Sequence, residues 1–496
     1  MLKLVFINAG NDKTEGGNAN MASFPPLGII SMATAIKEHF RDLCEVYLID
    51  GQLETLDDAC GIIASKNPDV VLVSMYCTGI NYVLECVRKA KACGAITVLG
   101  NDHAKAHYDT LLKNVPEIDL ISLEEFGEFM CMILVRKLLL GESIYSVPNV
   151  AYRTDDKVVC NARIYSDHTL LVNPLEHIPL PNRSLLDKKY WNTYLDNFKK
   201  VKSKIYSKDV ATGVTTMNRA RGCMNSHHRC AYCGIGDLSL YKASPISFWK
   251  DIEKAQMDVN ANFFYECFDN FTFSTNWLKE IAACRPSTIK DFYLCVYSSA
   301  NRITPEICDL LHHLGVYLVN LGLDSGDELG LRLLKGQNVS IDDNYRAVDM
   351  LTQNNMEMHI SFVLMGMGSN KSTKASMDKT MDFIRYLVKN TTVTILDCAL
   401  FYPDRTAPVG SLIWNPENFD RFKKSYELSY IDTSFLEAIH KKWKNQVYID
   451  SAEITRDFAR LCGTDYELLL DYQREIKKIC DENNISFGYS QAGRID

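Results

Sequence analysis

The sequence predicts an α/β protein: a doubly wound, Rossmann-like N-terminal domain, then a partial (β/α)6 barrel and a C-terminal helical tail. Apolar strand-like runs alternate with helical patterns through residues 1–150, and the same alternation resumes over residues 211–412. Residues 413–496 show mainly helical periodicity. The chain has 496 residues, which is too long for one core, so about two or three domains are expected.

In residues 1–150, strands are expected at 2–7, 45–49, 69–75, 96–100 and 118–122. The third strand is an almost unbroken apolar run, typical of a parallel sheet covered on both faces. The first helix is expected to begin at Pro25-Pro26-Leu27-Gly28, with proline in its first turn. Such sheets bind ligands beyond the carboxyl ends of their strands, so the loops at 8–24, 74–81, 100–107 and 123–128 are candidates.

Residues 151–210 are interrupted by Pro174, Pro179 and Pro181 and are expected to form an extended connector. Residues 211–412 are expected to form the barrel, with functional groups at the carboxyl ends of its strands. Its six strands are expected at 214–218, 263–267, 292–297, 317–322, 357–365 and 393–401. Residues 413–496 are expected to cap or pack against the rest of the protein.

Composition narrows the class of protein. The net charge is −8, which disfavours a nucleic-acid partner, and no apolar run approaches the roughly 20 residues that span a membrane. The N-terminal run is expected to be a strand and not a signal peptide. Most of the 17 cysteines lie in apolar segments, which favours free buried thiols over disulfides. A cytoplasmic protein is expected.

Only three cysteines cluster in the sequence, at Cys223, Cys230 and Cys233. They have the spacing Cys-x6-Cys-x2-Cys, after a strand-like run and before a helix. Clustered thiols in an intracellular chain indicate a metal site, and three ligands are one short of the usual four. An iron with an open coordination position is therefore the hypothesis. Structural zinc, or a chance arrangement, is the alternative.

Arg221-Gly222-Cys223 followed by Cys230-Ala231-Tyr232-Cys233 resembles the cluster loop of radical S-adenosylmethionine enzymes. The order of segments over about residues 1–412 resembles the subgroup with an N-terminal cobalamin-binding domain. The supporting segments are 25–28, Asp50, 99–104, 123–128 and 321–326.

In that family three thiolates hold a 4Fe–4S cluster, and S-adenosylmethionine chelates the fourth iron. A low-potential electron donor then allows cleavage to a 5′-deoxyadenosyl radical. The usual spacing is Cys-x3-Cys-x2-Cys, so the six residues 224–229 are a departure. His227 and His228 lie in this insert, and surface or substrate-facing loop residues are the favoured interpretation over cluster ligands.

The resemblance also implies cofactor contacts at the carboxyl ends of the barrel strands. A carboxylate at position 324 would accept hydrogen bonds from ribose hydroxyls. The alternative is that these residues form turns or cap strand ends. The implied S-adenosylmethionine contacts are Tyr232, Asp269, Asn270, Ser298, Asn301, Asp324 and Ser325.

The N-terminal domain lacks the sequence Asp-x-His-x-x-Gly that supplies a histidine ligand to cobalamin. The family's Gly-Gly after the fourth strand is Gly100-Asn101 here, and its Gly-Glu-Gly-Glu is Glu125-Phe126-Gly127-Glu128. Cobalamin is expected by analogy of fold, and a domain kept only for packing is the alternative. The expected cobalamin contacts are Ser74, Gly100, Asn101, His103 and Glu125.

The leading functional prediction is cobalamin-dependent methylation of an unactivated carbon or phosphorus of a small metabolite. A second hypothesis is radical dehydration, epimerisation or rearrangement without cobalamin. A third is a corrinoid or metal sensor without turnover. Tyr241, Tyr265, Tyr297 and Tyr402 are candidates for hydrogen donation or for lining the pocket, although packing is the more typical role in a chain with 25 tyrosines. The sequence does not name the substrate.

Overall fold

The computed structural model describes residues 1–11, 23–155, 157–162, 173–224, 229–235, 239–336, 338–364, 370–426, 428–429 and 431–488. The chain divides into two compact units that interleave in sequence. The first holds residues 1–199, 211–220 and 241–262, and the second holds 200–210, 221–240 and 263–496. Residues 151–199, expected as part of a connector, thus belong to the first unit. Residues 413–496, expected as a separate tail, belong to the second.

A sheet with strand order β2-β1-β3-β4-β5-β6-β7 forms the core of the first unit. β1 to β5 run parallel, in the order of a flavodoxin-like doubly wound fold. β6 pairs antiparallel with β5 and with β7, so residues 150–160 extend the sheet where a connector was expected. The strands are β1 (Leu2–Asn8), β2 (Cys44–Asp50), β3 (Val70–Ser74), β4 (Ile96–Gly100), β5 (Leu120–Ser122), β6 (Val150–Thr154) and β7 (Lys157–Cys160).

The helices of the first unit begin and end at local sequence signals. Thr55 caps α2 by accepting a hydrogen bond from the Asp58 N–H, and Ser244 caps α8, which has proline in its first turn. Residues 102–114 form two short helices that were not expected. The helices are α1 (Leu27–Phe40), α2 (Leu56–Lys66), α3 (Ile80–Ala92), α4 (Asp102–Ala106), α5 (Tyr108–Asn114), α6 (Gly127–Leu139), α7 (Lys188–Lys199) and α8 (Pro245–Val259).

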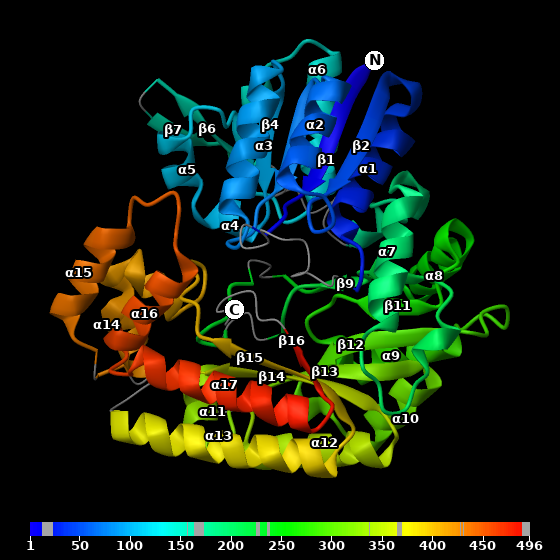
Figure 1. The fold of residues 1–496 in the computed structure, drawn as a ribbon. Helices are drawn as coiled ribbons and strands as arrows, with labels where there is room; N and C mark the ends of the chain where they lie inside the picture. The colour runs from blue at the N-terminus through cyan, green and yellow to red at the C-terminus, as the bar shows by residue number, and fades with distance from the viewer. Residues whose placement is uncertain are drawn as a thin grey trace. The chain divides into compact units, whose positions relative to one another are not determined.

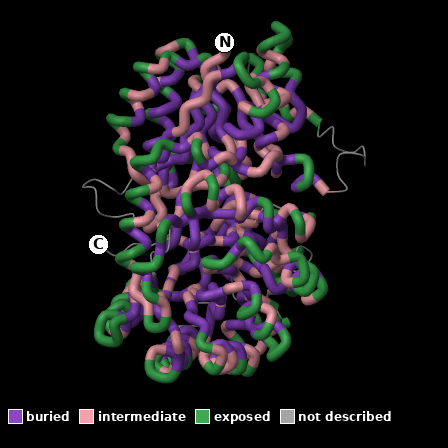
Figure 2. Tube along the Cα trace, turned by 90° about the vertical axis from the view of Figure 1, so that its right-hand side faces the viewer, coloured by how far each residue is buried: buried purple, intermediate pink, exposed green. Residues whose placement is uncertain are grey.

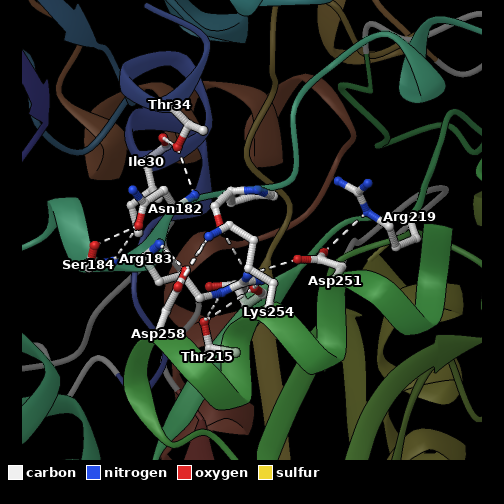
Figure 3. A network of polar contacts seen from close by, with 12 residues as sticks. Ile30, Thr34, Asn182, Arg183, Ser184, Thr215, Arg219, Asp251, Lys254 and Asp258 are labelled. Carbon is white, nitrogen blue, oxygen red and sulfur yellow. Dashed lines mark hydrogen bonds and ion pairs between the residues drawn. The ribbon is translucent and has the colours of Figure 1, made fainter. Parts of the chain in front are cut away.

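A buried polar network fastens the segment around Arg183 to α8 and to β8 (Val214–Met217), all within the first unit (Figure 3). The Arg183 guanidinium is fully buried; its Nη1 atom lies 2.8 Å from Asp251 Oδ1, and its Nε donates to Thr215 Oγ1 at 2.8 Å. Arg219 Nε lies 3.3 Å from the other Asp251 oxygen. Two guanidinium groups therefore neutralise one buried carboxylate.

The strands of the second unit follow one another in the order β16-β15-β14-β13-β12-β11, all parallel. β16, near the C-terminal end, was not expected and adds beside β15. This curved parallel sheet is the expected partial barrel. Its strands are β11 (Phe263–Glu266), β12 (Tyr293–Ser298), β13 (Val316–Asp324), β14 (Glu357–Leu364), β15 (Val393–Leu400) and β16 (Ser486–Gly488). Two short strands, β9 (Ala220–Arg221) and β10 (Tyr241–Lys242), flank the cysteine loop.

Helices α9 to α13 and α17 lie on one face of this sheet (Figure 1). Figure 2 shows that the strands are largely buried and that exposed residues concentrate on the helices. None of the described helices combines the length and apolarity that a membrane span requires. The helices are α9 (Thr275–Ala283), α10 (Pro305–His313), α11 (Glu328–Lys335), α12 (Ile341–Gln353), α13 (Asn370–Asn390), α14 (Phe419–Ser425), α15 (Thr433–Trp443), α16 (Ser451–Leu461) and α17 (Tyr466–Glu482).

The segment 200–210 covers the amino end of these strands. Glu357 Oε1, at the start of β14, accepts hydrogen bonds from Ser203 Oγ at 2.6 Å, Lys204 N at 2.6 Å and Ile205 N at 2.7 Å. Three donors on one buried carboxylate oxygen satisfy backbone groups that would otherwise be unpaired. The amino end of the barrel is therefore structural, and chemistry is left to the carboxyl end.

Candidate active site

The cysteine loop begins at a glycine that no other residue can replace without strain. Gly222 has φ of 94°, and a Cβ at this position would lie 1.9 Å from the carbonyl oxygen of Ser239. The chain turns sharply there and presents Cys223. Cys230 and Cys233 are joined by a backbone hydrogen bond from Cys233 N to Cys230 O of 3.0 Å. His227 and His228, in the insert, lie outside the described residues.

The three thiols are close enough to act on one another electrostatically. Burial raises the pKa of the Cys230 thiol to about 12; the charge of Lys335 opposes this, whereas Asp324, Cys233 and Cys223 add to it. Burial likewise raises the pKa of Cys233. Without a cation these thiols are protonated, and a bound metal would displace their protons. Within the described ranges, no three His, Cys, Asp or Glu side chains are already arranged as a metal site.

Segments distant in sequence hold this loop in place within the second unit. Ala231 N donates to Leu334 O at 2.8 Å, and Val409 N donates to Ala231 O at 3.0 Å. Thr406 Oγ1 donates to Gly234 O at 2.6 Å. The residues after β15 thus position the two last cysteines, a contribution that sequence reasoning missed because no local pattern signals it.

Arg229, the last residue of the insert, folds back over the loop. Its Nη2 donates to Cys233 O at 2.8 Å and also to Ile235 O, and its own carbonyl accepts from the Tyr426 hydroxyl at 3.0 Å. These bonds fix the chain just before Cys230. The Cys230–Cys233 turn is therefore held independently of the length of the loop that precedes it.

Asp324 is the centre of a second group of residues at the same edge. It has φ of 60°, a left-handed conformation that is unusual for a residue with a side chain, and it follows an irregularity in the pairing of β13 with β14. Burial and the charge of Asp324 raise the pKa of the Tyr232 phenol well above its usual value, and Lys335 Nζ lies 2.7 Å from Asp324 Oδ2. Backbone strain of this kind is typical of functional sites.

Lys335 was not predicted from the sequence. A lysine in the last turn of a helix usually interacts with the helix dipole, so its sequence position carried no other signal. Its side chain is only 11% exposed and also donates to Gly322 O. Its ammonium forms an ion pair with Asp324, and its positive charge opposes the rise in the pKa of the Cys230 thiol.

Two of the other expected contacts lie at the ends of β11 and β12 and are brought together. Asn270 Nδ2 donates to Ser299 Oγ at 2.9 Å, and Thr272 Oγ1 lies 2.6 Å from Ser298 Oγ. Asp269 is exposed, and its charge contributes to raising the pKa of Cys233, which places it on the cluster side of the edge.

Asn301 and Ser325 have backbone partners in the structure. Asn301 Nδ2 donates to Asn338 O at 2.9 Å, and Ser325 Oγ accepts from Asp327 N at 3.1 Å at the start of α11. These two bonds are the kind expected if Asn301 and Ser325 form turns or cap an element, which is the alternative interpretation. Their contacts with a cofactor stay predictions.

In the first unit, Ser74, Gly100 and Asn101 meet at the carboxyl ends of β3 and β4. Ser74 pairs in register with Gly100, and Asn101 Nδ2 donates to Ser74 Oγ at 3.1 Å. Asn101 has φ of 77°, the conformation that glycine adopts most readily, so it keeps the backbone shape of the glycine it replaces. Among the residues that the structure describes, a Cβ added at Gly100 would meet only Ser122 Cβ, at 4.0 Å.

The two remaining expected cobalamin contacts lie in neighbouring loops. His103 is buried, and its ring centroid is 4.5 Å from that of His107. Glu125, after β5, is partly exposed, and its N–H donates to Glu124 Oε1 at 3.0 Å. The buried acid of this loop is Glu128, which accepts from Ser31 Oγ at 2.6 Å.

The residues present fit the implied cofactors. Three mutually interacting thiols beside a lysine ammonium form a donor set suited to an iron–sulfur cluster with one open iron. The edge of the first sheet offers small side chains, a glycine-like turn and open space at Gly100, which let a bulky ligand approach the backbone.

Comparison with known proteins agrees with the fit of these residues to an iron–sulfur cluster and to cobalamin. The B12 binding domain model matches residues 22–132, and the radical SAM superfamily model matches residues 217–384. No match is found among curated proteins. The radical S-adenosylmethionine methyltransferase TsrM from Kitasatospora setae, with tryptophan substrate and a SAM analogue bound, is 15% identical, with a TM-score of 0.64, covering 84% of this chain and 77% of that chain.

A second similar structure is the cobalamin-dependent S-adenosylmethionine radical enzyme OxsB with aqua-cobalamin and S-adenosylmethionine bound. It is 15% identical, with a TM-score of 0.61, and the alignment covers 97% of this chain and 80% of that chain. At such identity, the likeness establishes the fold. The fold class expected from the sequence is therefore confirmed.

Proposed function

Because the chain is a member of the radical S-adenosylmethionine superfamily with an N-terminal B12-binding domain, we propose that it methylates an unactivated carbon or phosphorus of a small molecule. The family implies S-adenosylmethionine, a 4Fe–4S cluster and cobalamin as cofactors. The observation that supports the proposal most is the convergence of the cysteine loop, Tyr232, Lys335 and Asp324 at one edge of the barrel.

When bound, the cluster would supply the electron that cleaves S-adenosylmethionine to a 5′-deoxyadenosyl radical. Cys223, Cys230 and Cys233 would hold it. Asp324, oriented by Tyr232 and Lys335, would accept hydrogen bonds from the ribose hydroxyls, since charge-assisted bonds are the strong kind.

Further contacts to S-adenosylmethionine are proposed at the ends of β11 and β12, where the side chains lie on the same edge. Asp269 and Asn270 would face the methionine amino group, and Ser298 and Asn301 would lie beside it, with Ser325 supporting the turn after Asp324. In the first unit, Ser74, Gly100, Asn101, His103 and Glu125 would surround cobalamin, which would carry the methyl group.

The first test is formation of 5′-deoxyadenosine by the anaerobically reconstituted full chain with dithionite and S-adenosylmethionine. Wild type should form it, and the Cys230→Ala variant should not. If wild type forms no more 5′-deoxyadenosine than the Cys230→Ala variant, both radical-enzyme hypotheses are excluded and the sensor hypothesis is left.

The second test separates cobalamin-dependent methylation from dehydration, epimerisation or rearrangement without cobalamin. Asn101 keeps a glycine-like backbone but adds a side chain where the family has glycine, and that added side chain is the observation that favours the second candidate. The chain purified from cells supplied with hydroxocobalamin should show a corrinoid absorption spectrum. An active enzyme without corrinoid would establish the second candidate instead.

The substrate proposed is a small molecule, and the tryptophan bound in TsrM supports that class. A low-potential protein electron donor is the proposed partner. The acidic net charge of −8 continues to disfavour a nucleic acid.

A further inference from the structure

The barrel strands have one covered face and one open face. Along β14 and β15 every second side chain is fully buried against the helices, and the residues between them keep solvent-accessible area. Since side chains alternate between the two faces of a strand, the accessible set lies on the inner face of the curved sheet. The accessible set is His359, Ser361, Val363, Ile395, Asp397 and Ala399.

Two polar atoms of this inner face have no hydrogen-bond partner among the described residues: His359 Nε2 and Asp397 Oδ1. Such groups are costly inside a protein, and most are paired. Asp397 also has no ion-pair partner in the described part of the chain, and burial raises its pKa to about 6. Burial lowers the pKa of His359 to about 4, so its ring is neutral at physiological pH.

Tyr297 and Asp397 lie on the same face of the sheet. Tyr297 on β12 pairs in register with Asn320 on β13, and Asn320 pairs with His359 on β14. Ser361, two residues after His359 and therefore on the same face, pairs with Asp397 on β15. The ring of Tyr265 on β11 packs beside the ring of Tyr297, with centroids 5.9 Å apart.

We propose that this inner face binds the substrate through a positively charged amino group, which is held by Asp397 and packed against the Tyr265–Tyr297 pair. A carboxylate without a cation nearby favours a ligand that brings one, and phenol rings add cation–π attraction. The neutral His359 ring and the Ser361 hydroxyl would hydrogen-bond a polar group on the same ligand. The substrate class is therefore a small molecule with a primary or secondary ammonium group.

The position of this face suits the proposed function, on which the inference rests. Tyr297 immediately precedes Ser298, the last residue of β12, and Asp397 lies three residues before the end of β15. The ammonium site is therefore just inside the barrel edge that carries Asp324 and the cysteine loop. Substrates of barrels reach the chemistry at this carboxyl edge.

The test uses three probes with the same ring: benzylamine, benzyl alcohol and benzoate. Their binding to the anaerobic full chain is measured by calorimetry and by saturation-transfer NMR. Wild type should prefer benzylamine to benzyl alcohol by about tenfold or more, the size expected of one charge-assisted contact, and should reject benzoate.

Asp397→Asn should reduce the amine preference to about threefold or less. Its melting temperature should be unchanged or higher, because the variant removes an unpaired carboxylate, whereas loss of a purely structural carboxylate would lower it. Asp382→Asn, at an exposed position of α13, is the matched control and should behave as wild type.

Equal binding of amine and alcohol by wild type, no measurable amine binding, or a preference that survives Asp397→Asn would each overturn the inference. Probe binding requires no cleavage of S-adenosylmethionine. A wild type that forms 5′-deoxyadenosine but shows no amine preference contradicts this inference alone, and the reverse result contradicts the proposed function alone.

Discussion

Lys335 Nζ lies 2.7 Å from Asp324 Oδ2, and this ion pair stands beside the cysteine loop. Burial by itself would lower the pKa of the Lys335 ammonium, but Asp324 and the Cys230 sulfur reverse the effect and leave the pKa raised. The ammonium is therefore charged at neutral pH, and it orients the Asp324 carboxylate while offsetting negative charge on the thiolates.

Lys335→Met should leave Asp324 as a buried carboxylate without its cation. We expect the free energy of unfolding of the cluster-free chain to fall by about 3–5 kcal/mol, the usual cost of breaking a buried pair. Urea unfolding measures it. The double variant Lys335→Met with Asp324→Asn should recover most of the loss, and additive losses in this cycle would show that the two side chains do not interact.

The three clustered cysteines should be the ones that retain iron. Anaerobic reconstitution of wild type should yield about four iron and four sulfide per chain. Alanine at Cys223, Cys230 or Cys233 should remove most of both, whereas Cys284→Ala, at an exposed cysteine, should not. Zinc without acid-labile sulfide in wild type would contradict the cluster.

The buried carboxylate of Asp251 should make the first unit sensitive to acid. Burial would raise its pKa, but Arg183 and Arg219 outweigh burial and lower it below the ordinary value of 3.8. A lowered pKa means that the stabilisation is complete above about pH 4 and is lost as the pH falls through the native pKa.

Asp251→Ala should therefore lower the free energy of unfolding by about 3–5 kcal/mol at pH 7, and the difference from wild type should shrink toward pH 2. Circular dichroism against urea at several pH values measures this. Asp42→Asn, an exposed acid, is the control. A difference that stays constant with pH would show that the ion pair is not its cause.

Asn101 should tolerate glycine but not alanine. With φ of 77° and ψ of 167°, the Asn101 backbone lies in a region that essentially only glycine adopts without strain. Asn101→Ala should cost about 1–2 kcal/mol through strain and loss of the cap, whereas Asn101→Gly should stay within about 0.5 kcal/mol of wild type. Melting temperatures measure both; similar values for the two variants would argue against backbone strain.

Much of the fold could be predicted because most strands are marked by local runs of apolar residues. The strand Val70–Ser74 is apolar up to its last residue, as is typical of a parallel strand covered on both faces. The hairpin β6–β7 was missed because its stability comes from a non-local contact. It pairs with β5, and nothing in its own sequence indicates that it extends this sheet. β16 was missed for the same reason, since three residues beside β15 form no recognisable pattern.

The sequence by itself determined the two regions of strand–helix alternation, the positions of most of their strands and the three clustered cysteines, because hydrophobic periodicity and residue spacing are local properties. Only the tertiary structure decided that Lys335 meets Asp324 and that Thr406 and Tyr426 hold the cysteine loop. It also decided that Asp397 and Tyr297 share one face of the barrel sheet. These relationships depend on strand register and loop packing, which bring together side chains that lie from 11 to 197 residues apart in the chain.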